Sequence, residues 1–375
     1  MPELANRAVP ALLLAGVAAP ASSPAGVTVY DKGDTHLEFG GRLQAQYHLE
    51  SPDAGDSTDE LFFRRMRLYM EGGVTEDISG KWQVDFGKAG VSVKDAYIAY
   101  TALGPGRLTV GNHYVPFSRE SNTSSKRQQL VERTFVGDHN YGTPDRQLGL
   151  SYAGVTGPVG YQVGAYEAYI DADTKKLDFG SGTNKDDDWY GGKMVAGGLD
   201  FFLVGEPFKK AQGDFARAPS LALGINGFSW KNDDEQPAGT PAPAQQYDTA
   251  KGLSADVALR AGGLSVDAQY NRFATEANGS NVTSGLIEGG EGDFRTYAVE
   301  GGYMVVPSRA ELVAGYQALD ADAYDETWTR ASAGLNFFLN GHTDKLQATY
   351  RVGSNREGVD GKDANELFVQ FQHVI

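Results

Sequence analysis

The chain has 375 residues and a formal net charge of −16, and it contains 48 Gly, 19 Tyr, 18 Phe and no Cys. The absence of Cys excludes disulfides, Cys-zinc sites and thiol nucleophiles, and the net acidity argues against broad nucleic-acid binding, which needs clustered Lys and Arg. A mean hydropathy of −0.39 argues against a helical membrane protein, because each spanning helix needs about 20 mostly apolar residues.

The first 25 residues have the pattern of an export signal. Arg7 precedes an apolar, Ala-rich stretch at residues 8–19, which is too short for a transmembrane helix. Ser23 and Ala25 stand where a small-residue cleavage site requires them. We therefore expect a signal peptide over residues 1–25 and an exported mature chain over residues 26–375, with a disordered tail as the alternative.

The mature chain begins with a strand in which apolar and polar residues alternate, at residues 37–49. The same alternation recurs at residues 81–86, 253–259 and 345–352. Because successive side chains of a strand point to opposite faces, each of these segments has one apolar face and one wet face. Along the whole chain we expect about sixteen such segments of roughly ten residues, the length that a tilted strand needs to cross a bilayer.

The predicted connections alternate between short and long. The short ones are rich in turn formers, such as Leu-Gly-Pro-Gly at residues 103–106 and Ala-Gly-Gly at residues 261–263. Two connections break the rule: residues 205–218 are long among the short ones, and residues 89–90 are short among the long ones. The long connections are expected at residues 51–60, 113–146, 170–189, 231–249, 275–293, 321–326 and 355–362.

This asymmetry between the two ends is typical of an outer-membrane barrel. Strands in lipid must close into a ring, because an open edge leaves backbone groups unpaired, and a ring of sixteen strands is wide enough for an aqueous channel. A soluble sandwich also buries one face, but it seldom needs so many long strands. The sequence therefore predicts an all-β fold, a transmembrane antiparallel barrel of about 16 strands over residues 26–375.

Three segments resemble the phosphate-selective (OprO/OprP-like) outer-membrane porins. They are the Gly-Gly-Arg-Leu-Gln-Ala run at residues 40–45, the Phe-Phe-Arg-Arg-Met-Arg segment that opens residues 62–73, and residues 108–133 with their Thr-Ser-Ser-Lys run. The resemblance is specific over about residues 37–150 and architectural afterwards. It implies a homotrimeric, sixteen-stranded porin whose third loop folds inward as a constriction.

The resemblance also implies which residues guide anions. Arg42, Arg65 and Arg133 fall on anion-guiding positions of the family, Tyr114 follows the fifth strand as in the family, and Lys126 ends the Thr-Ser-Ser-Lys run. The chain departs from the family at three positions: Ser121 stands where the selective members have a lysine, Arg67 where they have an aromatic residue, and Ile375 where they have a closing Phe. We expect Arg67 to supply part of the charge that Ser121 lacks.

Parity places Arg65 and Arg67 in the lumen, since an arginine facing lipid at mid-membrane costs about 2–4 kcal/mol. Arg64 has the opposite parity, so it is expected at the rim or snorkelling to the interface. Basic residues arranged in a ring around a pore favour anions. Acidic residues also lie on the wet faces, so we expect the lumen to carry charges of both signs. These wet-face acids are Glu38, Glu71, Asp85, Asp256, Asp267, Glu300 and Glu311.

The long connection at residues 115–146, which corresponds to the family's third loop, fits two interpretations equally well. It carries Arg119, Lys126, Arg127, Arg133 and Arg146 against Glu120, Glu132, Asp138 and Asp145. Its residues alone fit a solvated, salt-bridged loop as well as an anion filter. The acidic residues of the other long connections could bind Ca²⁺ or Mg²⁺, but without a full ligand loop solvation is the favoured interpretation.

The predicted function is a water-filled outer-membrane channel for passive diffusion of small hydrophilic solutes, with a preference for anions such as phosphate. Alternatives are a general or sugar-selective porin without anion preference and an outer-membrane enzyme. The sequence has no G-x-S-x-G, H-E-x-x-H or G-x-x-x-x-G-K-[ST] motif, so no enzyme, cofactor or metal site is expected. Expected partners are the solutes, Gram-negative outer-membrane lipid and lipopolysaccharide, and two further copies of the chain, but no nucleic acid.

Overall fold

The computed structural model describes residues 26–375 except 172–174, 181–182, 184–188, 207, 209, 234–246, 278–282 and 284. The predicted signal peptide at residues 1–25 lies outside the described residues, as do parts of the acidic connections. Among the residues that are described, no helix is long and apolar enough to span a membrane.

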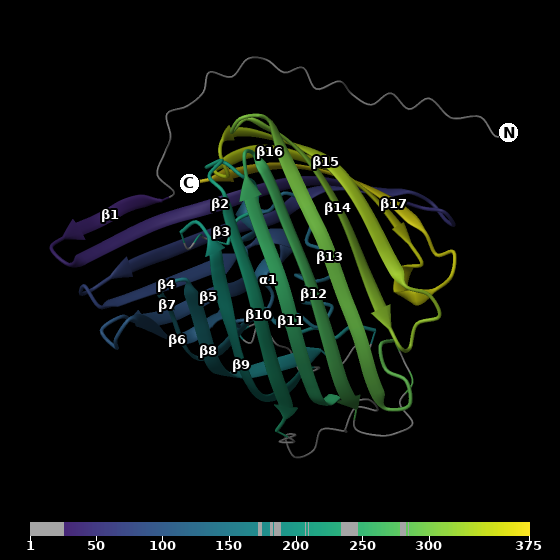
Figure 1. The fold of residues 1–375 in the computed structure, drawn as a ribbon, viewed down its shortest axis with the longest axis horizontal. Helices are drawn as coiled ribbons and strands as arrows, with labels where there is room; N and C mark the ends of the chain where they lie inside the picture. The colour runs from purple at the N-terminus through teal and green to yellow at the C-terminus, as the bar shows by residue number, and fades with distance from the viewer. Residues whose placement is uncertain are drawn as a thin grey trace.

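The described chain forms one closed antiparallel sheet of sixteen strands, β2 to β17, and a short additional strand, β1 (Figure 1). Each of these sixteen strands pairs with the next in the sequence, and β17 pairs with β2 to close the ring. The predicted barrel of about sixteen strands is therefore confirmed. The strands are β1 (Val27–Lys32), β2 (Thr35–Pro52), β3 (Thr58–Gly73), β4 (Ile78–Asp85), β5 (Ser92–Tyr100), β6 (Gly106–Tyr114), β7 (Arg146–Thr156), β8 (Val159–Asp171), β9 (Trp189–Val204), β10 (Ser220–Asn232), β11 (Tyr247–Ala261), β12 (Leu264–Ala277), β13 (Glu291–Val306), β14 (Ala310–Ala321), β15 (Trp328–Asn340), β16 (Asp344–Ser354) and β17 (Ala364–Val374).

The barrel wall is apolar outside and polar inside. Leu253 and Val299 are exposed on the outer face, whereas Gln44, Asn336 and Gln347 are buried on the inner face. This reverses the arrangement of a soluble protein, and it follows from the period-two pattern, because one parity of every strand must face lipid. Ring closure gives each of the sixteen strands a partner on both sides, so the sheet has no free edge strand in the hydrocarbon environment.

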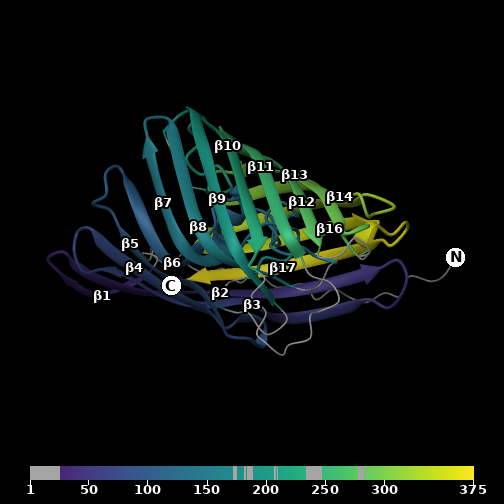
Figure 2. The same ribbon diagram turned by 90° about the horizontal axis from the view of Figure 1, so that it is seen from below.

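Both ends of the described chain lie along one edge of β2. Gly41 exchanges two backbone hydrogen bonds with Ile375, at 3.1 and 2.9 Å, and further along the same edge Phe39 pairs with Val27 of β1. Strand β1 therefore continues the line of β17, which runs beside β2 and β3 (Figure 2).

The connections differ in length at the two ends of the barrel. At one end, here called the short-turn end, residues 157–158 and 262–263 join adjacent strands directly. Gly262 and Gly263 both adopt positive φ there, a conformation that glycine takes without strain. At the other end, the long-loop end, residues 115–145 join β6 to β7. Residues 205–219, between β9 and β10, are an exception: they form a long connection at the short-turn end.

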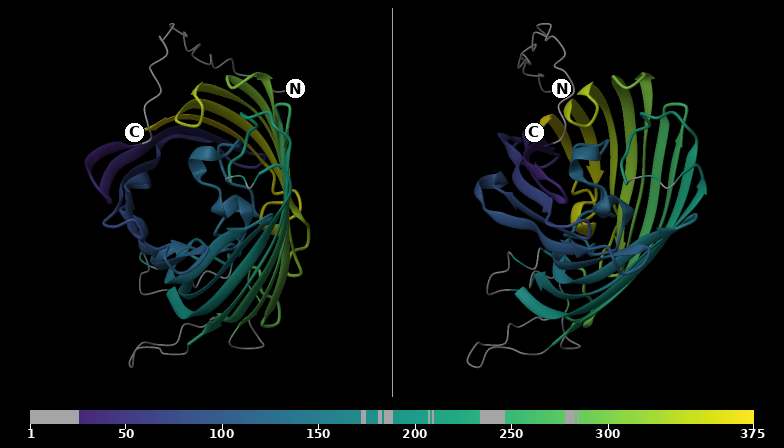
Figure 3. Two further views of the ribbon diagram at one scale, coloured as in Figure 1. Left: turned by 60° about the vertical axis from the view of Figure 1, so that its left-hand side comes forward. Right: turned by 90° about the vertical axis from the view of Figure 1, so that its left-hand side faces the viewer.

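Residues 115–145, here called the inward loop, lie inside the ring of strands (Figure 3). The loop contains α1 (Arg119–Asn122) and the 3-10 turn η2 (Ser125–Arg127); the other 3-10 turns are η1 (Gly87–Ala89) and η3 (Arg356–Gly358). The loop crosses to the opposite wall, where Asn336 Nδ2 donates to Gln129 O at 3.0 Å and Lys345 Nζ donates to Gln128 O at 2.8 Å. Phe117 and Phe135 of the loop pack with aromatic residues of the inner wall, so the hydrophobic core lies within the barrel.

Candidate permeation site

A β-bulge sets the direction of the arginines on β3. Gln44 pairs with Arg65 but Ala45 pairs with Phe63, which leaves Arg64 as an extra residue. Arg64 is thereby turned into the lumen, where its Nε and Nη2 donate to Glu132 at 2.6 and 3.0 Å. The expectation that Arg64 lies at the rim or snorkels to the interface was wrong, because a bulge resets the parity of a strand locally.

Two cavities lie between the inward loop and the wall formed by β2 to β7. The short-turn cavity has a volume of about 470 Å³ and reaches Glu38 and Glu71, and the long-loop cavity has a volume of about 400 Å³ and reaches Lys88 and Asp138. Arg67, Tyr114 and Arg146 line both cavities. These three residues therefore lie at the boundary between the two cavities; we call this boundary the constriction and the two cavities together the passage.

All six residues proposed from the sequence line this passage. Arg42 and Lys126 line the short-turn cavity, and Arg65 and Arg133 line the long-loop cavity. Arg67 and Tyr114 line both. Arg133 also braces the inward loop, because its Nη1 and Nη2 donate to the backbone oxygens of Glu120 and Thr123. Their role in guiding anions stays a prediction.

Arg42 and Arg67 are direct neighbours across β2 and β3. The Nε of Arg67 donates to Asp85 Oδ2 at 2.7 Å, which fixes its position. Arg42 is only 7% exposed, and among the described residues its Nε has no hydrogen-bond partner. Like charges directly opposite each other destabilise a sheet, so this pair leaves a positive field in the passage that an anion would neutralise.

The constriction also depends on Arg146, which the sequence analysis counted only among the loop bases. Arg146 is the first residue of β7 and the ladder partner of Tyr114, and its guanidinium lies 3.8 Å from the centre of that ring. Asp95 Oδ1 accepts from its Nε at 2.5 Å and Asp145 Oδ1 accepts from its Nη1 at 3.1 Å. In the sequence, Tyr114 and Arg146 stand near the two ends of the connection expected at residues 113–146, and this placement is the signal that could have identified Arg146.

Bases outnumber acids in both cavities, although the whole chain is acidic. Seven bases face three acids in the short-turn cavity, and seven face four in the long-loop cavity. Such an excess in a narrow, low-dielectric passage raises the local concentration of anions. The bases are Arg42, Arg67, Lys81, Arg107, Lys126, Arg127 and Arg146 in the first cavity and Arg64, Arg65, Arg67, Lys88, Lys94, Arg133 and Arg146 in the second.

Burial and neighbouring charges shift the pKa values of three ionisable groups in the inward loop. Burial, together with Arg127 and Arg42, lowers the pKa of Lys126 to about 8. Burial would raise the pKa of Glu132, but the bidentate contact with Arg64 outweighs it and holds that pKa well below its usual value. Burial likewise opposes protonation of His139, yet the carboxylate of Asp178 raises its pKa to about 9.

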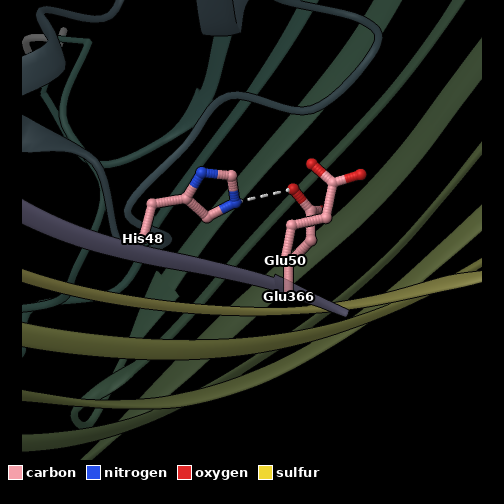
Figure 4. A group of neighbouring side chains, drawn as sticks. All are labelled: His48, Glu50 and Glu366. Atoms are coloured by element: carbon pink, nitrogen blue, oxygen red, sulfur yellow. Dashed lines mark hydrogen bonds and ion pairs between the residues drawn. The ribbon is translucent and has the colours of Figure 1, made fainter. Parts of the chain in front are cut away.

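One group of potential metal ligands lies on the inner wall where the barrel closes (Figure 4). His48 Nε2 lies 3.1 Å from Glu366 Oε1, and Glu50 is the direct ladder partner of Glu366. Among the described residues, these are the only three His or carboxylate side chains whose ligand atoms lie within 4.8 Å of one another. Arg356 pairs with Glu50 at 2.5 Å and Arg351 pairs with Glu366 at 3.5 Å. Because both carboxylates are neutralised by arginine, we interpret the group as a salt-bridge cluster.

Comparison with known proteins relates this passage to a family. Residues 37–197 match the family model described as phosphate-selective porin O and P. Over these residues the chain is similar to the phosphate-selective porins O and P, and the match covers less than half of the chain. The matched span contains most of the wall from β2 into β9 and the whole inward loop, and every charged residue that lines the two cavities lies within it. A comparison of the chain with curated proteins gives no match.

Solved structures share the fold of the chain. OmpF of Salmonella typhi, solved in complex with daunomycin, is 12% identical with a TM-score of 0.61 over 92% of this chain and 100% of that chain. The anion-selective porin from Comamonas acidovorans is 13% identical with a TM-score of 0.61 over 91% and 100%. A loop-deletion mutant of OmpT from Vibrio cholerae is 16% identical with a TM-score of 0.59 over 91% and 100%. At these sequence identities the similarity shows a shared fold and nothing more.

Proposed function

We propose that this porin forms a passive diffusion channel through the outer membrane for small hydrophilic solutes and prefers anions such as phosphate. The observation that carries the proposal is the surplus of bases along the passage, above all Arg42, whose buried guanidinium faces Arg67. The family match over residues 37–197 supports it. So does the similarity of fold to a porin described as anion-selective.

The geometry suggests how an anion would move. From the long-loop end it meets Arg65 and Arg133, passes between Arg67 and Arg146, and leaves beside Arg42 and Lys126. Guanidinium groups hold phosphate or carboxylate oxygens bidentately, so each can replace part of the water that the anion loses. Arg67 and Arg146 are held by carboxylates, whereas Arg42 and Arg65 form no ion pair within the described residues, which leaves their charge for the solute.

Passage rather than tight binding is the expected behaviour toward phosphate. Ser121 replaces the family's lysine in the long-loop cavity. Lys94 lines the same cavity, but its Nζ lies 3.6 Å from Asp145 and shares its charge with that carboxylate. Conduction requires that a site bind weakly enough for the ion to leave. We therefore propose a channel that admits phosphate without a high-affinity site.

Planar-bilayer recording in a KCl gradient, with phosphate titrated in, tests this function. We expect an anion-selective reversal potential, and we expect Arg65→Ala and Arg133→Ala to move it toward cations. Arg272→Ala is the matched control, because it removes the same charge from an exposed residue that is paired with Asp293 and does not line the passage. A cation-selective potential in the unmodified porin, unchanged by the two lumen variants, would refute the anion preference.

The alternatives have less support. A general or sugar-selective porin would show no charge preference in the same recording. An enzyme would need an activated nucleophile, and a Ser–His pair does line the short-turn cavity, with His113 Nε2 2.7 Å from Ser151 Oγ. The other ring nitrogen of His113 contacts the backbone oxygen of Gly111 at 2.8 Å rather than a carboxylate. Without an acidic partner to orient the imidazole, the pair lacks the arrangement of a hydrolase.

Two further parts of the proposal concern the partners of the porin. We propose that three copies assemble through their outer walls, as the resemblance implies. We also propose that the long connections meet lipopolysaccharide at the outer surface. Cross-linking of the porin in native outer membranes tests the assembly, and a mass of a single copy after cross-linking would contradict it.

A further inference from the structure

Four of the seven acids that the sequence places on wet faces do not line the open passage, whereas Glu38, Glu71 and Asp85 do. Asp256 is 7% exposed, Glu300 4% and Glu311 0%, and none of the three lines either cavity. They lie on β11, β13 and β14, outside the β2 to β7 wall that carries most of the passage bases. The lumen therefore has a cationic half that is open and an acidic half that is covered.

Three polar side chains cover these three acids. From the inward loop, Arg119 Nε donates to Asp256 Oδ1 at 2.6 Å, and Gln129 Nε2 donates to Glu311 Oε1 at 2.7 Å. Gln212 Nε2 donates to Glu300 Oε1 at 3.0 Å. Gln212 belongs to the long connection between β9 and β10, which enters from the opposite end of the barrel.

Residues 210–217 of that connection, here called the lumen segment, clamp the tip of the inward loop. The Gln212 N–H donates to Arg127 O at 2.9 Å, and Gln212 Oε1 accepts from Gln129 N at 2.7 Å. His342 Nε2 lies 2.9 Å from Gln212 O. One glutamine thus joins the inward loop, the acidic wall and a turn of the short-turn end.

Further contacts seat the lumen segment inside the wall. Asp214 Oδ2 accepts from Gly263 N at 2.6 Å, and Asp214 Oδ1 accepts from Arg217 N at 2.8 Å. Phe215 packs edge-on against Phe338 and His342, with ring centres 4.9 Å apart in each case. The segment is therefore a packed part of the structure that fills the acidic half from the short-turn end.

We propose that the lumen segment determines selectivity: it shields the acidic wall and holds the inward loop, so that every permeating solute passes the arginines. A ring of sixteen strands is otherwise wide enough for a large aqueous channel, and uncovered carboxylates would attract cations into it. The inference rests on the proposed anion preference and adds a specificity element outside the matched family span, which ends at residue 197.

Shortening the connection tests the inference directly. Val204 and Leu221 are already ladder partners, so residues 205–220 can be replaced by an Asn-Gly turn that suits a two-residue hairpin. We expect a higher single-channel conductance and an anion-to-cation permeability ratio that falls by roughly threefold or more as carboxylates join the channel lining. A conducting, shortened porin with an unchanged permeability ratio would overturn the inference.

Neutralising two of the three covered acids separates the effect of their charge from the effect of a wider channel. Glu300→Gln together with Glu311→Gln should restore the anion preference of the shortened porin and leave that of the intact porin unchanged. If the shortened chain does not fold, Gln212→Ala with Asp214→Ala releases the same clamp and should change the ratio in the same direction. A reversal potential identical to that of the intact porin in this second variant would equally count against the inference.

Failure of the proposed function gives a different result. An intact porin without anion preference refutes the function before any variant is made. The chain has no Cys, so Gln129→Cys with Gln212→Cys reports the clamp independently through a specific disulfide. If the two cysteines do not cross-link under oxidising conditions, the proposed clamp is refuted, whatever the selectivity.

Discussion

The guanidinium of Arg146 stacks on the ring of Tyr114, 3.8 Å from its centre, at the point where the two cavities of the lumen meet. The two residues are partners in the ladder between β6 and β7, on either side of the inward loop. The loop thus leaves and re-enters the wall at the constriction, and the charge there is held by both of its ends. We therefore expect selectivity and loop anchoring to depend on the same pair.

Replacing Arg146 should damage both properties. Arg146→Ala removes a constriction charge and leaves Asp95 and Asp145 without their shared arginine, and breaking a buried ion pair in this way costs about 3–5 kcal/mol. Arg146→Lys keeps the charge but loses the stacked, forked geometry. We expect the reversal potential to shift toward cation selectivity strongly in Arg146→Ala and partially in Arg146→Lys. The temperature of thermal unfolding in detergent should fall most in Arg146→Ala. Equal potentials in all three proteins would contradict the assignment.

Lys126 should make the selectivity depend on pH. Its pKa of about 8 means that it is charged at pH 7 and largely neutral at pH 9, so the anion preference should decrease as pH rises through this range. Lys126→Arg should remove this component, because an arginine stays charged. The measurement is the reversal potential at pH 7, 8 and 9 from the short-turn side. A pH profile that is the same in the porin and in Lys126→Arg would assign the effect to another group.

The bulged Arg64 should stabilise the inward loop through Glu132. Both side chains are mostly buried, so Arg64→Ala is expected to cost about 2 kcal/mol in the free energy of unfolding, below the range for fully buried pairs. The double variant Arg64→Ala, Glu132→Gln should recover part of this loss, because no unpaired carboxylate remains. Denaturant unfolding of refolded porin measures both. Additive losses in the double variant would argue against the pair.

The same ion pair should contribute to acid sensitivity. The pKa of Glu132 is lower in the folded state than its usual value of about 4.3. A depressed pKa adds stability that is fully present above the unfolded value and is lost as pH falls toward the folded one. Between pH 5 and pH 3 the porin should therefore lose more stability than Glu132→Gln does. Parallel stability curves for the two proteins would exclude this contribution.

The predicted signal peptide can be checked on the exported protein. We expect cleavage after Ala25, so the mass of the outer-membrane form should correspond to residues 26–375. Ala25→Arg should block this cleavage, because the site requires a small residue. An outer-membrane form that retains residues 1–25 would contradict the prediction.

Local pattern was sufficient for the barrel and for most of the arginines. Alternation with period two identifies Arg65 and Arg67 as lumen residues, because the two faces of a strand differ in solvent whatever the rest of the fold does. Alternation also identified Glu300 and Glu311 as wet-face residues, and the structure agrees that both point inward. It failed at Arg64, where one inserted residue resets the parity and no neighbouring residue signals the bulge.

The sequence by itself determined that a closed ring of about sixteen strands surrounds water, since the alternation of apolar and polar residues within each strand distinguishes its lipid face from its lumen face. Only the tertiary structure decided which part of that lumen stays open. The contacts that cover the acidic half join residues far apart in the chain, such as Gln129 with Glu311 at a separation of 182 residues. A hydrogen bond across the lumen leaves no periodic trace in either strand, so the mixed charge expected from the faces became a cationic passage only when the inward loop and the lumen segment were in position.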